Sequence, residues 1–462
     1  MFFEDTIAAI STPLGLGAVS IVRISGNAAF KIADTVFEGS IVLSKADSHS
    51  IHYGYLVDPK NGEKIDSVLV SVMRAPKTYT GFDSIEINCH GGMVNTKRVL
   101  DLVLSQGVRL AEPGEFTKLA YLNGKMDLSQ VEAVADILHA KTEGARRASM
   151  SQFMGNLREE IAVLRNQLIQ LCSLLEIDLD FAEENLLAID PNNVKSKLTD
   201  VEERTIKLLS TYQTGHIIRE GAKVSILGKP NVGKSSLLNT LLRKDRAIVS
   251  HIPGTTRDYI EETIDINGIP FTFVDTAGIR DTKDDIEIHG IHFSKENIMS
   301  SDLIVALFDI STDLDDDDRK VMNIINEARL NSDTIKVIFV GNKKDLGENI
   351  DHLNDLMVLG PVVKISAKSH EGIDDLKTEI SNLFQMKTSF SSPMISRIRH
   401  KIALENSLKS LAAAKQSLEN NISFEFVALD LRNATTTMSE IVGEITSDEV
   451  LNNIFANFCI GK

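Results

Sequence analysis

The N-terminal part of the chain alternates short apolar runs with turn residues. Apolar runs at 18–24, 67–73 and 84–88 predict strands, and apolar residues at helical spacing predict a helix over 94–104. Gly-Asn, Asp-Pro and Asn-Gly pairs stand between these runs, and such pairs favour turns. The pattern predicts an α+β domain over residues 1–123.

Apolar residues at alternating steps of three and four dominate two later parts of the chain. This spacing places apolar side chains along one face of a helix. The stripes run over residues 157–175, 194–212, 404–418 and 427–441. They predict a helical domain in two parts, residues 124–220 and 386–462.

Between these two parts, strands alternate with helical segments. The predicted strands are 224–227, 271–274, 303–309, 336–340 and 362–365. Such alternation is typical of a mostly parallel, doubly wound sheet. We therefore predict that an α/β unit, residues 221–385, is inserted into the helical domain, which is feasible because domain termini often lie close together. Within it, the acidic run 315–318 is predicted to be a solvated loop.

Composition and charge limit the classes of protein and the cellular compartments that fit this chain. The chain has 462 residues, 43% of them hydrophobic, which suits about three globular domains. A net charge of -16 argues against binding of nucleic acid through the overall electrostatic field of the protein. A local basic patch or a basic partner could still bind it. Widely spaced Cys89, Cys172 and Cys459 indicate neither a zinc site nor a disulfide framework. With no signal peptide and no apolar run long enough for a bilayer, we expect a cytoplasmic protein without membrane contact.

A phosphate-binding loop follows the strand at 224–227. Gly228 to Ser235 fits GxxxxGK[ST] between a strand and a helix, the context that this motif requires. Glycines let backbone N–H groups approach phosphate oxygens, and the helix N-terminus adds its positive end. Lys234 is expected to reach the β- and γ-phosphates, and the Ser235 hydroxyl to coordinate Mg²⁺. The alternative is a chance glycine-rich turn, which the following motifs disfavour.

Two further motifs fit the same site. Asp275, at the head of the Asp-Thr-Ala-Gly motif 275–278, follows a strand and can hold Mg²⁺ through water, while Gly278 can offer its N–H to the γ-phosphate. Thr256, in the Gly-Thr-Thr-Arg-Asp motif 254–258, is the expected second magnesium hydroxyl.

The base is predicted to be guanine. Asp345, which ends Asn342-Lys343-Lys344-Asp345, can accept two hydrogen bonds from the N1–H and 2-amino edge of guanine, whereas adenine would leave it unpaired. Ser366-Ala367-Lys368 follows the last strand and should support the base. The whole predicted GTP-binding set is Asn231, Val232, Gly233, Lys234, Ser235, Ser236, Ser250, His251, Ile252, Pro253, Gly254, Thr255, Thr256, Asp275, Thr276, Ala277, Gly278, Asn342, Lys343, Lys344, Asp345, Ser366, Ala367 and Lys368.

The residues leave the activation of water open. Small GTPases commonly place Gln directly after DxxG, but here that residue is Ile279. The acids of the following loop are Asp281, Asp284, Asp285 and Glu287, and the residues alone do not choose among them. A potassium ion near the phosphate bridge could supply the positive charge that an arginine gives elsewhere. An oxygen cage for it could be formed by Asn231, Ser250, Ile252 and Thr255, unless Asn231 merely shapes the loop.

These motifs, together with the ending Phe458-Cys459-Ile460-Gly461-Lys462, resemble the MnmE (TrmE) family of tRNA modification GTPases from Thr6 to Lys462. The resemblance implies an N-terminal domain like tetrahydrofolate-binding domains, a helical domain and an inserted Ras-like P-loop G domain. It implies that magnesium is held by Ser235 and Thr256, that Glu287 orients the water, and that potassium is held by Asn231, Ser250, Ile252 and Thr255. The residues implied for 5-formyltetrahydrofolate, or a related tetrahydrofolate, are Arg23, Glu86, Lys125 and Lys462.

By the same resemblance, the protein is a homodimer whose G domains associate in a potassium-dependent manner during GTP hydrolysis. With an FAD-containing MnmG-type partner, in a heterotetramer or larger complex, it would add a carboxymethylaminomethyl group to C5 of the wobble uridine of certain tRNAs. Two rivals stay open: a ribosome-assembly switch, and a folate-dependent enzyme whose GTPase is only regulatory.

Three positions allow a simpler structural interpretation when the family resemblance is set aside. Arg23 and Glu86 could be ordinary outward-facing residues of alternating strands. Cys459 could be a nucleophile or a small buried hydrophobe.

Overall fold

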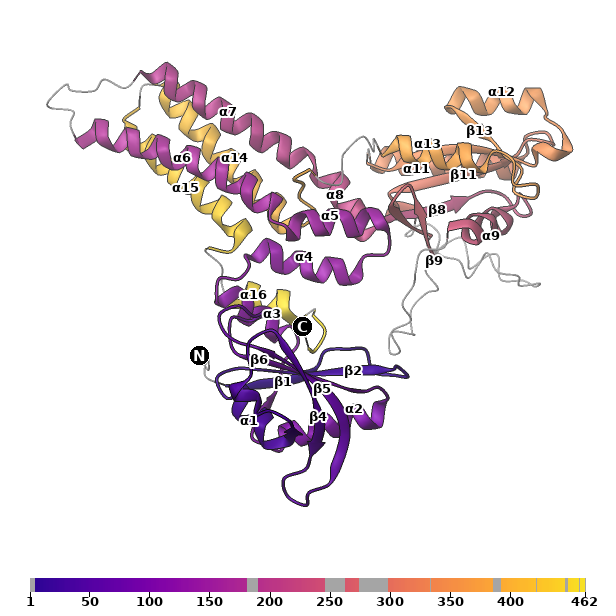
Figure 1. Ribbon diagram of the computed structural model, residues 1–462. Helices are drawn as coiled ribbons and strands as arrows, with labels where there is room; N and C mark the ends of the chain where they lie inside the picture. Colours follow the sequence, from indigo (N-terminus) through magenta and orange to yellow (C-terminus); the bar gives the residue numbers. More distant parts are fainter. Residues whose placement is uncertain are drawn as a thin grey trace. The chain divides into compact units, whose positions relative to one another are not determined.

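The computed structural model describes residues 5–180, 190–245, 262–273, 298–332, 334–384, 392–420, 422–444, 448–456 and 458–461. The chain divides into two compact units, which are coloured along the sequence in Figure 1. One unit comprises Met1–Ala135 with Ser439–Lys462, and the other comprises Asp136–Met438. Among the described residues, none of the helices has the length and apolar character that a membrane span requires.

The first unit is built on a seven-stranded sheet in the order β3-β4-β5-β6-β2-β1-β7. Neighbouring strands are antiparallel, except that β1 and β7 are parallel. The strands are β1 (Ile7–Ile10), β2 (Val19–Ser25), β3 (Phe37–Gly39), β4 (Ser50–Val57), β5 (Lys64–Met73), β6 (Ser84–His90) and β7 (Arg109–Leu110). Helices α1 (Ala29–Val36) and α2 (Met93–Leu104), with the short η1 (Leu43–Lys45), share one buried cluster with this sheet. The α+β prediction is confirmed, including the helix over 94–104.

Residues near the C-terminus pack within this first unit. Helix α16 (Asp448–Ala456) contacts α3 (Glu115–Leu122), and Ile460 forms a bridge with Pro113. The carbonyl of Gly461 accepts a hydrogen bond from Ser11 Oγ at 3.2 Å. The predicted division placed all of 386–462 in the helical domain. The structure differs because these contacts join residues 439–462 to the N-terminal unit.

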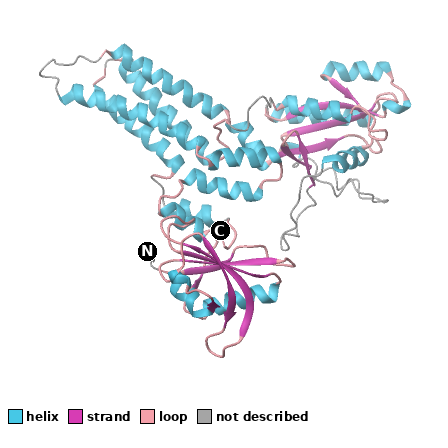
Figure 2. Cartoon of the chain, viewed as in Figure 1, coloured by secondary structure: helices cyan, strands magenta, loops and turns pink. Residues whose placement is uncertain are grey.

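The second unit contains long helices and an α/β part, and Figure 2 shows its helices in cyan and its strands in magenta. Its helical elements are α5 (Glu143–Phe153), α6 (Asn156–Asp180), α7 (Pro191–Ser210), α8 (Tyr212–Glu220), α14 (Ile398–Glu419) and most of α15 (Phe424–Val442), while α4 (Leu128–His139) spans the boundary between the units. The six apolar residues that form the first predicted stripe are all buried: Leu157, Ile161, Leu164, Leu168, Leu171 and Leu175. The predicted helices are confirmed, with one difference: Tyr212 begins α8 instead of extending α7.

The α/β part has a six-stranded sheet in the order β13-β12-β11-β8-β10-β9. All pairs are parallel except β9 with β10. The elements are β8 (Ala222–Leu227), α9 (Lys234–Asp245), β9 (Glu262–Ile266), β10 (Ile269–Phe273), β11 (Leu303–Asp309), α11 (Asp316–Asn331), β12 (Lys336–Asn342), η2 (Lys344–Leu346), α12 (Ile350–Leu359), β13 (Val362–Lys364) and α13 (Ile373–Leu383).

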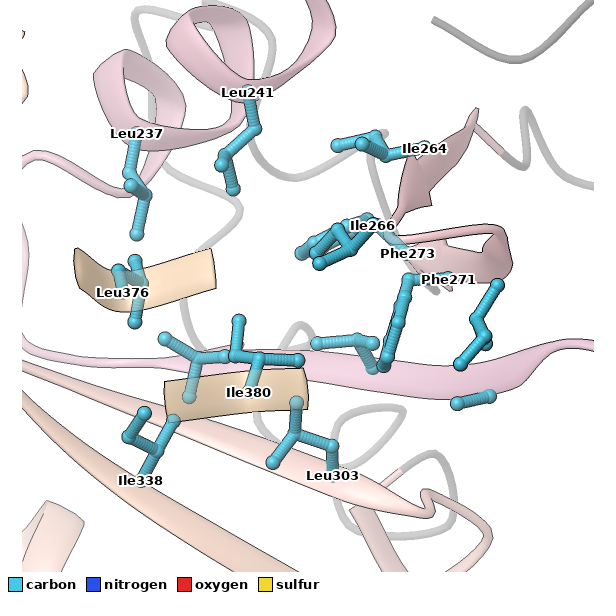
Figure 3. Close-up of a cluster of buried hydrophobic side chains, with 14 of the residues drawn as sticks. Leu237, Leu241, Ile264, Ile266, Phe271, Phe273, Leu303, Ile338, Leu376 and Ile380 are labelled. Carbon is cyan, nitrogen blue, oxygen red and sulfur yellow. The ribbon is translucent and has the colours of Figure 1, made fainter. Parts of the chain in front are cut away.

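Two buried clusters cover the two faces of this sheet. One contains α9 and α13 side chains such as Leu237 and Leu376, drawn in Figure 3. The other contains α11 and α12 side chains such as Ile325 and Leu356. Helices on both faces of a mostly parallel sheet confirm the doubly wound prediction.

The β9–β10 hairpin is joined to the helical part of the same unit. Ala145 of α5 and Ile217 of α8 belong to the buried cluster that contains Ile269. Thr142, the N-cap of α5, donates from Oγ1 to the Gly268 carbonyl at 2.6 Å and accepts from Ala145 N at 3.2 Å. These contacts hold the turn of the hairpin against the N-terminus of α5.

The prediction of a solvated loop at 315–318 is wrong. Asp315 is the N-cap of α11, where it forms a capping box with Asp318. The side chain of Asp318 is 0% exposed and lies 2.8 Å from the ammonium of Lys229. The acidic run is a helix start, because carboxylates there bind free N–H groups and face the positive end of the helix.

Candidate nucleotide-binding site

The phosphate loop connects the end of β8 to the start of α9, and its backbone requires glycine at particular positions. Gly233 has φ +107°, and a Cβ there would lie 2.3 Å from Nδ2 of Asn342. A Cβ on Gly228 would lie 2.5 Å from the carbonyl oxygen of Leu307. Asn231 also has a positive φ of 57°, a conformation that asparagine tolerates better than most residues. The loop is thus a tight turn at the N-terminus of a helix, which is a site suited to anions.

Lys234 begins α9 and reaches back over the loop. Its Nζ donates to the carbonyl oxygens of Gly228 at 2.8 Å and Lys229 at 3.0 Å. Ser235 follows in the first turn of the helix. The ammonium and the hydroxyl expected to meet phosphate and Mg²⁺ therefore lie at the same helix end.

Asn342 ties the phosphate loop to the last predicted motif. Its Nδ2 donates to the Val232 carbonyl at 2.8 Å, and its Oδ1 accepts from Ala367 N at 2.9 Å. The residue is 3% exposed. Because one buried amide uses both of its ends, the two segments are held at a fixed spacing.

Asp345 lies in η2, on the side of the site assigned to the base. Its Oδ1 accepts from Ser366 Oγ at 2.7 Å, and Ser366 Oγ accepts from Ser369 N at 3.1 Å. These two hydrogen bonds fix one carboxylate oxygen of Asp345, as expected for a group that must bind the planar edge of a base.

Lys343 stabilises the turn before Asp345. The residue adopts a left-handed conformation with φ +66°, and its Nζ lies 2.7 Å from Oδ2 of Asp309, at the end of β11. Burial acts to raise the pKa of Asp309, but hydrogen bonds from Lys343 and Ser311 outweigh it and lower that pKa below its ordinary value. The carboxylate of Asp309 is therefore ionised and pairs with Lys343 in the turn that precedes Asp345.

A cavity of about 460 Å³ lies where these segments meet. Its volume is within the range of small-molecule sites. Its lining combines the phosphate loop and both predicted base motifs: Asn231, Gly233, Ser236, Asn239, Thr240, Asn342, Lys343, Asp345, Leu346, Ala367, Lys368 and His370. The three predicted segments 231–236, 342–345 and 366–368 thus each contribute residues to one cavity.

The other predicted residues of the GTP and metal sites fall outside the described residues. These are Ser250, His251, Ile252, Pro253, Gly254, Thr255, Thr256, Asp275, Thr276, Ala277, Gly278 and Glu287. Lys462, predicted for folate, and the other acids of the loop after 280 are also outside them.

Arg23 and Glu86, two of the residues implied for folate, form a pair. They are directly opposite on β2 and β6, and Arg23 Nη2 lies 2.8 Å from Glu86 Oε1. The guanidinium carbon lies 5.7 Å from the ring centroid of Tyr79 and 5.5 Å from that of Phe116. The side chains of Arg23 and Glu86 are 18% and 22% exposed, so each is largely covered by its neighbours. Lys125 donates to the Pro76 carbonyl at 2.5 Å.

The cysteines differ in their exposure. Cys89 and Cys172 are buried and Cys459 is exposed, so the alternative that Cys459 is a small buried hydrophobe is wrong. Burial raises the pKa of both buried thiols to about 11. Within the described part of the chain, no cluster of histidine, cysteine and acidic side chains could hold a metal ion.

Sequence reasoning missed several residues that build the site. Thr240 donates from Oγ1 to the Ala367 carbonyl at 3.0 Å. Asp309 pairs with Lys343 at the base end of the site, and Lys229 pairs with Asp315 at the phosphate end. Asp309 carried a usable signal, because it ends a buried parallel strand next to the phosphate-loop strand, where ligand-binding side chains gather.

Comparison with known proteins identifies relatives over the full length of the chain. Family models match residues 6–125 (GTP-binding protein TrmE N-terminus) and 128–459 (MnmE helical domain). The tRNA modification GTPase MnmE of Carboxydothermus hydrogenoformans is 44% identical, covering 99% of this chain and 100% of the relative. The proteins of the same name from Acetivibrio thermocellus and Geobacillus thermodenitrificans are each 42% identical, covering at least 99% of both chains.

Proposed function

The chain belongs to the family of MnmE tRNA modification GTPases, and from this premise we propose that it acts on the wobble uridine of certain tRNAs. The protein is a GTP-hydrolysing enzyme of tRNA modification. In the proposed reaction, a carboxymethylaminomethyl group is added to C5 of that uridine with the help of an FAD-containing, MnmG-type partner. The observation that carries the proposal is a cavity lined by the phosphate loop and by Asp345, a carboxylate suited to guanine. Asn342 joins Val232 of that loop to Ala367 in the same cavity.

Magnesium and GTP fit the described donor set. Ser235 offers a hydroxyl beside Lys234 at a helix N-terminus, and hard oxygen donors together with phosphate suit Mg²⁺. In the proposal Ser235 and Thr256 hold the ion, which would neutralise charge on the β- and γ-phosphates. Lys234 binds phosphate oxygens, and Asp345 accepts hydrogen bonds from the guanine edge.

For water activation we propose Glu287, with a potassium ion bound by Asn231, Ser250, Ile252 and Thr255. Asn231 supports the ion site, because it lies in the phosphate loop and lines the cavity. Glu287→Ala is expected to leave GTP affinity nearly intact while lowering kcat, since the acid acts on the water and not on the nucleotide. Asp285→Ala is the matched control, and an equal loss of kcat in both variants would contradict the assignment to Glu287.

The N-terminal unit would bind 5-formyltetrahydrofolate and form the homodimer. The Arg23–Glu86 pair, with the rings of Tyr79 and Phe116 near Arg23, provides charge and planar surface, which suits a folate. Lys125 and Lys462 complete the proposed set. The outer face of the sheet carries exposed apolar side chains, among them Ile51 (65%) and Tyr53 (60%). Exposed apolar patches mark protein interfaces, which supports a dimer through this face.

The β9–β10 hairpin offers a route from the nucleotide to the helical domain. In sequence it lies between Thr256 and Asp275, both of which are expected to interact with Mg²⁺. Its turn is bonded to Thr142 of the helical part. We infer that the GTP cycle, through association and dissociation of G domains, acts on the helical domain along this contact.

Mass spectrometry of tRNA nucleosides tests the proposal. A deletion strain is expected to lose the modified wobble uridine, and the wild-type gene to restore it. Unchanged wobble uridines would favour a ribosome-assembly role instead. One-carbon transfer by Glu287→Ala with GTP bound addresses the remaining alternative, because full activity would mean that the GTPase is only regulatory.

A further inference from the structure

Lys229, the second residue of the phosphate loop, makes an ion pair that the nucleotide site alone does not explain. Its Nζ lies 2.8 Å from Oδ2 of Asp315 and 2.8 Å from Oδ2 of Asp318. The Lys229 side chain is 13% exposed and that of Asp318 is 0% exposed, whereas Asp315 is 53% exposed. We call these three residues the Lys229 clamp.

The buried carboxylate makes the clamp a strong constraint. A carboxylate removed from water needs a cation or several hydrogen-bond donors, and removing the partner leaves a costly unpaired charge. Lys229, in the phosphate loop, supplies that cation to Asp318 of α11 across 89 positions of sequence. Burial acts to lower the pKa of Lys229, but hydrogen bonds to Asp315 and Asp318 raise it above its ordinary value, so the ammonium stays charged.

The main chain of Lys229 acts in the loop itself. Its carbonyl oxygen accepts from Lys234 Nζ at 3.0 Å and from Val232 N at 3.4 Å. A single residue therefore contacts the phosphate-binding lysine through its backbone and α11 through its side chain. Displacing the side chain would displace the carbonyl that helps to place Lys234.

The connection from β11 to α11 reaches both ends of the nucleotide site. At its start, Asp309 holds Lys343 beside the base-recognition residue Asp345. At its end, Asp315 and Asp318 hold Lys229 in the phosphate loop. The segment 309–318 thus fixes the base end and the phosphate end from one side.

We propose that Asp318 is a positioning residue: through Lys229 it holds the phosphate loop in the conformation that receives the β-phosphate. GTP and GDP share that phosphate, so loss of the clamp weakens the binding of both. The γ-phosphate chemistry depends on other groups, so kcat at saturating GTP changes little. The inference rests on the proposed GTP site and adds to it a residue that touches no nucleotide.

Nucleotide binding by the full chain tests the clamp. Asp318→Asn is expected to raise the Kd of GTP and of GDP about 10-fold, to raise KM similarly, and to leave kcat within about 2-fold, a pattern of lost ground-state binding. Asp317→Asn is the matched control, because Asp317 lies on the same helix turn in an exposed pair with Lys320. An equal Kd in the two variants, or a fall in kcat with unchanged KM, would overturn the proposal.

A double-mutant cycle keeps the test decisive if one variant folds poorly. Lys229→Met and the double variant Lys229→Met/Asp318→Asn are measured beside Asp318→Asn, and the double variant leaves no buried charge unpaired. The double variant is expected to bind no more weakly than either single variant, and Lys229→Arg to retain most of the affinity. Additive losses would mean that the residues act separately. Wild-type protein that binds no GTP would refute the proposed function, whereas wild-type affinity in Asp318→Asn would refute the clamp alone.

Discussion

Replacing Asn342 with alanine removes the link between the phosphate loop and the base motif. Asn342 is 3% exposed, and the change deletes its two hydrogen bonds, one to the Val232 carbonyl and one from Ala367 N. A buried polar group left without its partner costs about 1–3 kcal/mol, so the pair costs about 2–6 kcal/mol. Even the lower end corresponds to about a 30-fold change in an equilibrium constant. We expect this cost to appear as weaker nucleotide binding together with lower thermal stability of the α/β unit.

Isothermal titration with GTP and with GDP, alongside thermal unfolding, measures both effects. Both nucleotides should be affected equally, because Asn342 orders the site shared by the base and the β-phosphate. Asn239→Ala is the matched control: Asn239 lines the same cavity but is exposed. Wild-type affinity and an unchanged melting temperature in Asn342→Ala would refute the reasoning that this amide organises the site.

Three further outcomes follow from the described contacts and from the proposed ion site. Gly233→Ala should abolish tight GTP binding, measured by titration, because its Cβ would lie 2.3 Å from Asn342 Nδ2 at φ +107°; near-normal affinity would show that the loop can relax. A thiol reagent at pH 8 should label Cys459 rapidly, but Cys89 and Cys172 only after unfolding, since both are buried with pKa values of about 11; rapid labelling of all three would contradict this burial. Exchanging potassium for sodium should strongly reduce GTP turnover, and equal rates in both salts would remove the proposed cation site.

The α/β part is where sequence patterns predict the structure most closely. The apolar run at 303–309 coincides with β11, since a parallel strand covered on both faces requires an unbroken apolar sequence. The phosphate loop was also predictable, because its glycines and its lysine have fixed positions relative to the strand and helix. Motifs of this kind contain both the backbone geometry and the chemistry in a few consecutive residues.

Contacts between distant segments were not predictable in the same way. The composition of the acidic run 315–318 is that of a solvated loop. The buried carboxylate of Asp318 is paired with Lys229, which is far away in sequence. Apolar stripes at helical spacing identify a buried face but not the partner that covers it. For this reason the packing of residues 439–462 in the N-terminal unit was missed, and the last predicted stripe, 427–441, ends before α16 begins.

Nucleotide specificity of Asp345→Asn tests the central claim, that this carboxylate reads the edge of guanine. Xanthine has a carbonyl oxygen where guanine has its 2-amino group, and an asparagine amide can donate to that oxygen. Turnover of GTP, ATP and XTP is measured for both proteins. The wild type should prefer GTP over ATP by about 10⁴-fold or more, and Asp345→Asn should lose GTP turnover while gaining XTP turnover. Equal use of GTP and ATP by the wild type, or unchanged GTP turnover in the variant, would contradict the account.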